Sequence, residues 1–108
     1  MIATPIIAVD FDGCLCTDEW PGIGKPNLRA LHELKKRQRN GARIILWTCR
    51  TGEMLQAALD WCRLFGLDFD AVNANVQEVI DAYGGDARKI FAHEYWDDKA
   101  VVCHARDV

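Results

Sequence analysis

Short apolar runs recur along the chain, and the polar residues that follow them mark where each run ends. The plainest are Ile6-Ile7-Ala8-Val9 and Ile44-Ile45-Leu46-Trp47, which contain no polar residue. Continuous apolar runs of this length are typical of strands buried on both faces of a sheet. We expect strands at residues 6–9, 44–47, 69–73 and 90–96, with a small fifth strand at 100–103.

In the segments between these runs, apolar residues recur at the spacing of an α-helix. Each expected helix begins at a capping residue: Asn27, Thr51, and Asn75, which stands three residues before Glu78 in the spacing of a capping box. The first two helices each show one apolar face, formed by Leu28, Leu31 and Leu34, and by Met54, Leu55, Ala58, Trp61, Cys62 and Phe65. The expected helix ends are Gly41, Gly66 and Gly84-Gly85.

Alternation of buried strands with amphipathic helices predicts the fold class. Strands that are apolar on both faces belong to a parallel sheet covered by helices on both sides. We therefore expect an α/β fold, with a Rossmann-like parallel sheet of four to five strands flanked by helices. The 108 residues fit one domain, so residues 1–108 are expected to form a single unit.

Polar residues gather at the carboxyl ends of the expected strands. They are Asp10, Asp12, Thr48, Asn73, Asp97 and Asp98. Right-handed crossovers bring these ends to one edge of the sheet, where open α/β sheets bind their ligands. Four carboxylates at one edge repel each other unless a cation lies among them, and oxygen ligands suit Mg²⁺. We expect a Mg²⁺ site there, with Thr48 placed to donate to an anion beside Asp10.

Composition and charge narrow the possible functions. Half of the residues are hydrophobic, 27% are charged, and the formal net charge is −3. This apolar fraction is typical of a globular domain, and the mild acidity argues against a nucleic-acid-binding module. No segment approaches the ~20 apolar residues that a membrane span requires. The amino-terminal segment shows no basic leader, so we expect a cytoplasmic protein.

The cysteines show no recognisable metal or disulfide pattern. There are five, an odd number, with no CxxC spacing: Cys14, Cys16, Cys49, Cys62 and Cys103. Such a set is typical of reduced thiols in the cytosol. The CxC pair formed by Cys14 and Cys16 is a weak zinc signal, and we interpret these thiols as buried or bystander groups.

The order of these motifs resembles the haloacid dehalogenase (HAD) superfamily of phosphotransferases. Its signature is a hydrophobic strand that ends in DxDG, a strand that ends in Thr or Ser, a later Lys or Arg, and a strand that ends in an acidic pair. The matching segments here are Ile6–Gly13, Ile44–Thr48, Lys89 and Tyr95–Asp98. Within the superfamily, the chain looks most like small bacterial and phage hydrolases that contain the segment Trp-Thr-Cys-Arg-Thr-Gly, present here as residues 47–52.

The resemblance implies a phosphomonoester hydrolase that acts through an aspartyl-phosphate on Asp10. Asp12 would protonate the leaving group and then activate water, while Thr48 and Lys89 would hold the phosphoryl group. Mg²⁺ would be held by the Asp10 carboxylate, the Asp12 backbone carbonyl and Asp97, with Asp98 binding directly or through water. Positioning and charge neutralisation are most of what phosphoryl transfer requires.

The resemblance also bears on the loops. Family members commonly carry a cap domain, whereas residues 13–26 allow only a flap loop, so the chain resembles a minimal, capless member. Arg50 and Asn73 are candidate substrate contacts, with a surface arginine and a turn asparagine as the alternatives. Trp20 is either a flap residue that faces the substrate or a loop anchor, and we interpret His93 as structural.

Two other functions use similar residues. A signalling receiver domain also combines Asp, Thr, Lys and Mg²⁺, but it phosphorylates an Asp on a mid-chain strand, and here the mid-chain strands end at Thr48 and Asn73. A non-catalytic binding or regulatory protein on a HAD scaffold is the second alternative. We expect a small phosphorylated substrate; the sequence indicates neither its identity nor whether the chain forms a homo-oligomer.

Overall fold

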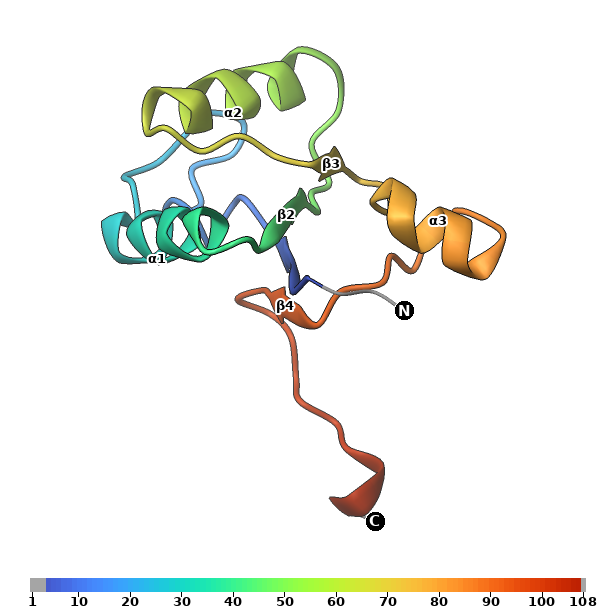
Figure 1. The fold of residues 1–108 in the computed structure, drawn as a ribbon. Coiled ribbons are helices and arrows are strands. Elements are labelled where there is room, and N and C mark those ends of the chain that lie inside the picture. Colours follow the sequence, from blue (N-terminus) through green and yellow to red (C-terminus); the bar gives the residue numbers. More distant parts are fainter. Residues whose placement is uncertain (1–3, 108) are drawn as a thin grey trace.

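A four-stranded parallel sheet forms the centre of the molecule. The computed structural model describes residues 4–107. The sheet has the order β3-β2-β1-β4 and consists of β1 (Ile6–Val9), β2 (Arg43–Leu46), β3 (Ala71–Val72) and β4 (Glu94–Trp96) (Figure 1). All three strand pairs are parallel. The Rossmann-like α/β fold expected from the sequence is confirmed.

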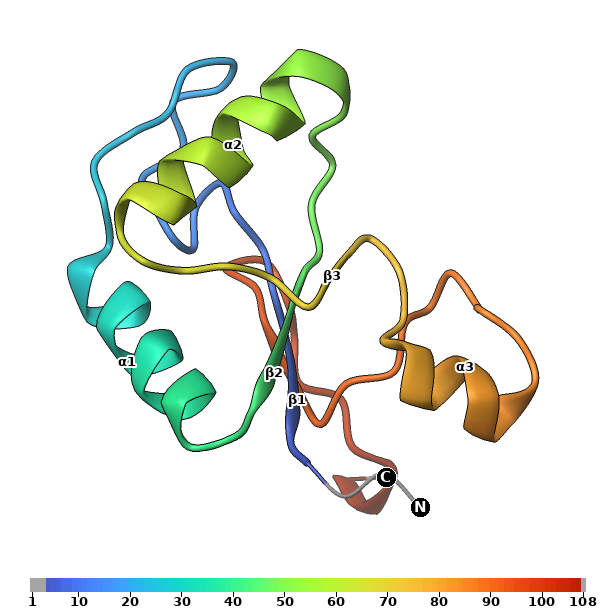
Figure 2. The same ribbon diagram turned by 45° about the horizontal axis from the view of Figure 1, so that its top comes forward.

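Helices cover both faces of this sheet. The helices α1 (Leu28–Arg39) and α2 (Gly52–Leu64) lie on one side of the strands, and α3 (Gln77–Tyr83) lies on the other (Figure 2). The Asn27 side chain accepts a hydrogen bond from the Ala30 N–H and so caps α1 as expected. Thr51 precedes α2 at the expected position, although its side chain makes no capping bond.

The strand side chains alternate between two apolar clusters. Ile7 and Val9 pack in the cluster beneath α1 and α2, whereas Ile6 and Ala8 pack in the cluster that includes Val79 of α3. Each of these four strand residues is at most 1% exposed. Alternate residues of a strand point to opposite faces, so a sheet covered on both sides needs an uninterrupted apolar strand.

The strand expected at 90–96 is shorter than predicted. Of this range only Glu94–Trp96 forms the strand β4, which pairs with β1, and side chains bind part of the backbone before it. The Tyr95 hydroxyl donates to the Ile90 carbonyl at 2.5 Å and accepts from the Ala92 N–H, while the His93 ring accepts from the Ile6 N–H. The structural interpretation of His93 fits this contact.

Four further local expectations are wrong. The strand expected at 69–73 is reduced to β3, and residues 100–103 lie outside the sheet without strand pairing, in a segment that runs away from the body of the protein (Figure 1). The capping box does not form: Asn75 instead binds Asp86, Ala87 and Phe91, and Val76 takes the N-cap position. Leu28 is 63% exposed rather than packed with Leu31.

Candidate active site at the carboxyl edge of the sheet

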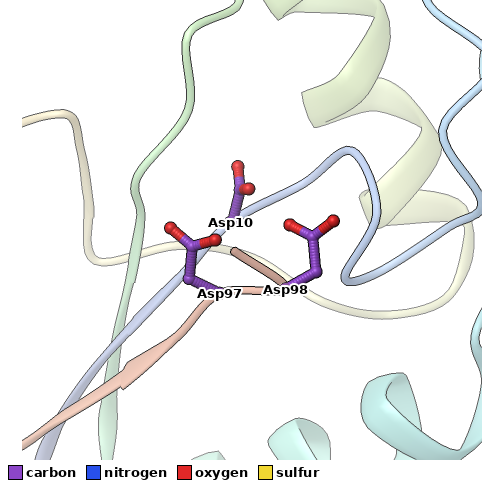
Figure 3. A group of neighbouring side chains, drawn as sticks. All are labelled: Asp10, Asp97 and Asp98. Carbon is purple, nitrogen blue, oxygen red and sulfur yellow. The ribbon is translucent and has the colours of Figure 1, made fainter. Parts of the chain in front are cut away.

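Strand register brings three carboxylates together at the carboxyl edge of β1 and β4. Val9 lies opposite Trp96, so the next residues, Asp10 and Asp97, lie side by side, and the Asp10 N–H donates to the Trp96 carbonyl at 2.9 Å. Asp10, Asp97 and Asp98 each offer an oxygen within 4.8 Å of the others (Figure 3). Two adjacent parallel strands therefore place the first and last acidic motifs at one point.

The electrostatics of Asp10 indicate a site that favours a cation. The pKa of Asp10 is raised from 3.8 to about 6, chiefly by burial, while the Phe11 N–H, which donates to the carboxylate at 2.8 Å, partly opposes this shift. Repulsion from Asp97, Asp98 and Asp12 contributes to the raised pKa of Asp10. A divalent cation among these groups would stabilise the ionised form of Asp10. The donor set, carboxylate oxygens alone, is the one that Mg²⁺ prefers.

Gly13 allows Asp98 to approach the loop after β1. A Cβ atom at this position would lie 2.3 Å from the Asp98 Oδ2 atom, and the Gly13 φ of +83° is one that side chains rarely adopt. The turn continues with a hydrogen bond from the Gly13 N–H to the Cys16 carbonyl. The glycine of the DxDG motif thus serves both the turn and the close contact with Asp98.

Asp12 does not belong to the group of three carboxylates and pairs with Arg50. The Arg50 Nε and Nη2 atoms donate to the two Asp12 oxygens at 2.8 and 2.7 Å. Arg50 is 1% exposed and also donates to the carbonyls of Pro21, Gly22 and Met54. Its guanidinium lies 5.0 Å from the ring centres of both Phe11 and Trp20. Arg50 is therefore a buried residue that joins Asp12 to the loop before α1.

Thr48 and Asn73 form the neighbouring part of the edge, beyond β2 and β3. The Asn73 side chain accepts a hydrogen bond from the Thr48 N–H at 2.8 Å, and the Thr48 hydroxyl accepts from the Arg50 N–H at 3.1 Å. Asn73 has a φ of +52°, a conformation that asparagine tolerates well. These bonds orient Thr48 beside Asp10.

Two cavities meet at this edge and share Asp10, Thr48 and Cys49. The smaller, about 230 Å³, is also lined by Asp12, Asp18, Trp20, Arg50 and Lys99. The larger, about 440 Å³, is also lined by Trp47, Asn73, Arg88 and Asp97. All the site residues predicted from the sequence, except Lys89 and Asp98, line at least one of these two cavities. Asp98 lies at the site because its carboxylate is close to those of Asp10 and Asp97.

Lys89 lies away from these cavities. It is exposed and lines two other hollows, together with residues such as Tyr83 and Val102. Arg88, the neighbouring residue, lines the larger site cavity and donates to the Asn73 carbonyl at 3.3 Å and to Asp86. Lys89 alone was predicted from the sequence, and the irregular backbone before β4 places the neighbouring Arg88 at the site instead. Sequence reasoning also missed Asp18 and Lys99, which lie in loops without a motif.

One solved structure matches this chain closely. It is the structure of a conserved protein from Bacteroides thetaiotaomicron, with 39% sequence identity and a TM-score of 0.80. The match covers 92% of this chain and 79% of that one. The chain belongs to the family of this conserved Bacteroides protein. The two proteins share the fold over nearly the whole length of this chain.

Sequence comparisons add no further relatives. No protein-family model matches the chain, and no curated protein matches it. Among the described residues, no helix is both long and apolar enough to cross a membrane.

Proposed function

We propose that this protein is a Mg²⁺-dependent phosphomonoester hydrolase of the HAD type, acting through a phosphorylated Asp10. The observation that carries this proposal is the position of Asp10. Its carboxylate lies within 4.8 Å of oxygens of Asp97 and Asp98, and in a cavity that it shares with Asp12 and Thr48. A nucleophile, a cation-binding group and a second carboxylate are the parts that this chemistry requires.

Asp10 would act as the nucleophile. One carboxylate oxygen forms a bond to phosphorus, the bond from phosphorus to the ester oxygen breaks, and the leaving oxygen takes a proton from Asp12. Water then attacks the aspartyl-phosphate, gives a proton to Asp12 and releases inorganic phosphate, which restores the free Asp10. Asp10, Asp97 and Asp98 would hold Mg²⁺, which supplies positive charge to the phosphoryl oxygens when bound.

Arg50 would position Asp12 for these proton transfers. Both Asp12 oxygens accept from Arg50, yet each carboxylate oxygen has a second lone pair that remains available. Because Arg50 is itself held by three backbone carbonyls, it keeps the Asp12 carboxylate in one orientation. Proximity and orientation of this kind contribute much of enzymatic rate acceleration.

Thr48 and Arg88 are the groups we propose for the phosphoryl oxygens. Thr48 lies beside Asp10 in both cavities, and Arg88 lines the larger one with Asn73. Arg88 here takes the part that the resemblance implied for Lys89, because Lys89 does not line either site cavity. A hydroxyl and a guanidinium both donate to phosphate oxygens, and a guanidinium does so through two parallel bonds.

Hydrolysis of p-nitrophenyl phosphate with and without Mg²⁺ tests this proposal. We expect turnover with Mg²⁺, loss of activity in excess EDTA, and poor replacement by Ca²⁺, whose looser coordination would misplace the nucleophile. Asp10→Asn should abolish turnover, and Asp97→Asn should raise the Mg²⁺ concentration required for half-maximal rate. Asp81→Asn, on the exposed face of α3, is the matched control and should behave as the parent.

Full activity in excess chelator, or in Asp10→Asn, would contradict the assignment. Tight Mg²⁺ binding without turnover on any phosphomonoester would instead favour a binding protein on the same scaffold.

A further inference from the structure

Trp20 lines the smaller site cavity without belonging to the apolar core. It is 56% exposed and packs in neither of the two apolar clusters. The buried Arg50 guanidinium, 5.0 Å from the ring centre, holds the indole in place, and the Trp20 backbone N–H donates to the Asp18 side chain at 3.3 Å. A large aromatic surface is therefore fixed at the cavity and left open to solvent.

The distribution of residues between the two cavities indicates where the leaving group would lie. The proton donor must reach the ester oxygen, and Asp12 lines only the smaller cavity, together with Trp20. Arg88 and Asn73, which suit phosphoryl oxygens, line only the larger one. The phosphoryl group therefore belongs on the side of the larger cavity, and the leaving group belongs against Trp20.

The geometry points to Trp20 as a stacking surface for a flat aromatic ring in the leaving group, and to nucleoside monophosphates as the substrate class. This inference rests on the phosphatase function proposed above. An exposed indole binds flat rings by stacking, and such stacking tolerates any base. Asp18 and Lys99, in the same cavity, add an acceptor and a donor for the sugar hydroxyls or the base edge.

A matched pair of substrates distinguishes the contribution of base stacking from that of the hydrolysis itself. A nucleoside 5′-monophosphate and ribose 5-phosphate share the same primary ester, and they differ in the base alone. We expect kcat/KM to be about 10- to 100-fold higher for the nucleotide, the range that one stacked base provides. Purine and pyrimidine nucleotides should both show this preference, because stacking does not depend on the hydrogen-bonding edge.

Variants of Trp20 test whether this residue is responsible. The ratio of the two kcat/KM values should fall to within about 2-fold of unity in Trp20→Ala and recover in large part in Trp20→Phe, which keeps a ring. Using the ratio corrects for any general loss of activity caused by disturbing Arg50. Tyr83→Ala removes an aromatic ring on α3 that is also exposed, 68% against 56% for Trp20, and should leave the ratio unchanged.

Three results would overturn the inference. The first is equal kcat/KM for the nucleotide and ribose 5-phosphate in the parent protein. The second is a preference that survives in Trp20→Ala, and the third is turnover of p-nitrophenyl phosphate with neither natural-type ester accepted. In each of these cases the phosphatase function itself stands. If none of the three compounds is hydrolysed in the presence of Mg²⁺, both proposals are overturned.

Discussion

Arg50 connects the candidate catalytic loop to the rest of the molecule. It is 1% exposed, forms a two-bond ion pair with Asp12 and donates to three backbone carbonyls. From the sequence, Arg50 was as consistent with a surface arginine as with a substrate contact. Its role depends on residues 21 and 22, nearly thirty positions away, and no local pattern reports such a contact.

Replacing Arg50 should destabilise the protein far more than replacing an exposed arginine. Arg50→Met leaves the Asp12 carboxylate and three carbonyls without their partner, and we expect a loss of about 3 kcal/mol in the free energy of unfolding. Arg63→Met is the control: Arg63 is 62% exposed and pairs with Asp60 and Asp68, so its loss should cost less than about 1 kcal/mol. Urea denaturation measures both; similar losses would contradict the assigned role of Arg50.

Among the elements, those with a long or uninterrupted pattern were predicted well. The β1 and β2 strands and the α1 and α2 helices lie within one or two residues of the expected ranges, because burial on two faces or on one helical face leaves a clear repeat. The β3 and β4 strands are two and three residues long, and the Tyr95 hydroxyl binds the backbone at Ile90 and Ala92, just before β4. Such contacts leave no repeat in the sequence.

The buried thiols should be unreactive in the folded protein. Cys14, Cys16 and Cys62 are buried or half-buried, and burial raises the pKa of Cys62 from 9.0 to about 12 and that of Cys14 from 9.0 to about 11. Cys49 and Cys103 are exposed. We expect iodoacetamide at pH 8 to modify Cys49 and Cys103 first, as read by peptide mass spectrometry, and the other thiols only on unfolding.

The raised pKa of Cys62 also predicts how the stability of the fold changes in alkaline solution. An unfolded thiol loses its proton near pH 9.0, whereas folded Cys62 keeps its proton until about pH 12. The unfolded state then binds fewer protons, so the stability of the fold should fall as pH rises through this window. Cys62→Ala should make the free energy of unfolding fall less steeply with pH. An unchanged dependence on pH would show that Cys62 contributes nothing to it.

At the scale of the whole molecule, the candidate site is a product of topology. The prediction of a site at the carboxyl edge of the sheet depended only on the strands being parallel, and β1 and β4 do bring Asp10, Asp97 and Asp98 together. The division of the edge into two cavities, and the place of Trp20 over Arg50, depend on how the loop before α1 folds back. Loops of this kind are positioned by tertiary contacts, so the sequence predicted the acidic centre better than its surroundings.

Trapping the phosphorylated protein is the most direct test of the central claim, that Asp10 is the nucleophile. In Asp12→Asn, the attack of Asp10 on p-nitrophenyl phosphate needs little help from an acid. Hydrolysis of the aspartyl-phosphate then lacks its general base, and such a base is typically worth about 10²–10⁴-fold in rate. The phosphorylated form should therefore accumulate with Mg²⁺ and be found, after acid quench and mass spectrometry, on Asp10. Phosphate on another residue, or no phosphoprotein in an Asp12→Asn variant that still turns over, would contradict the account.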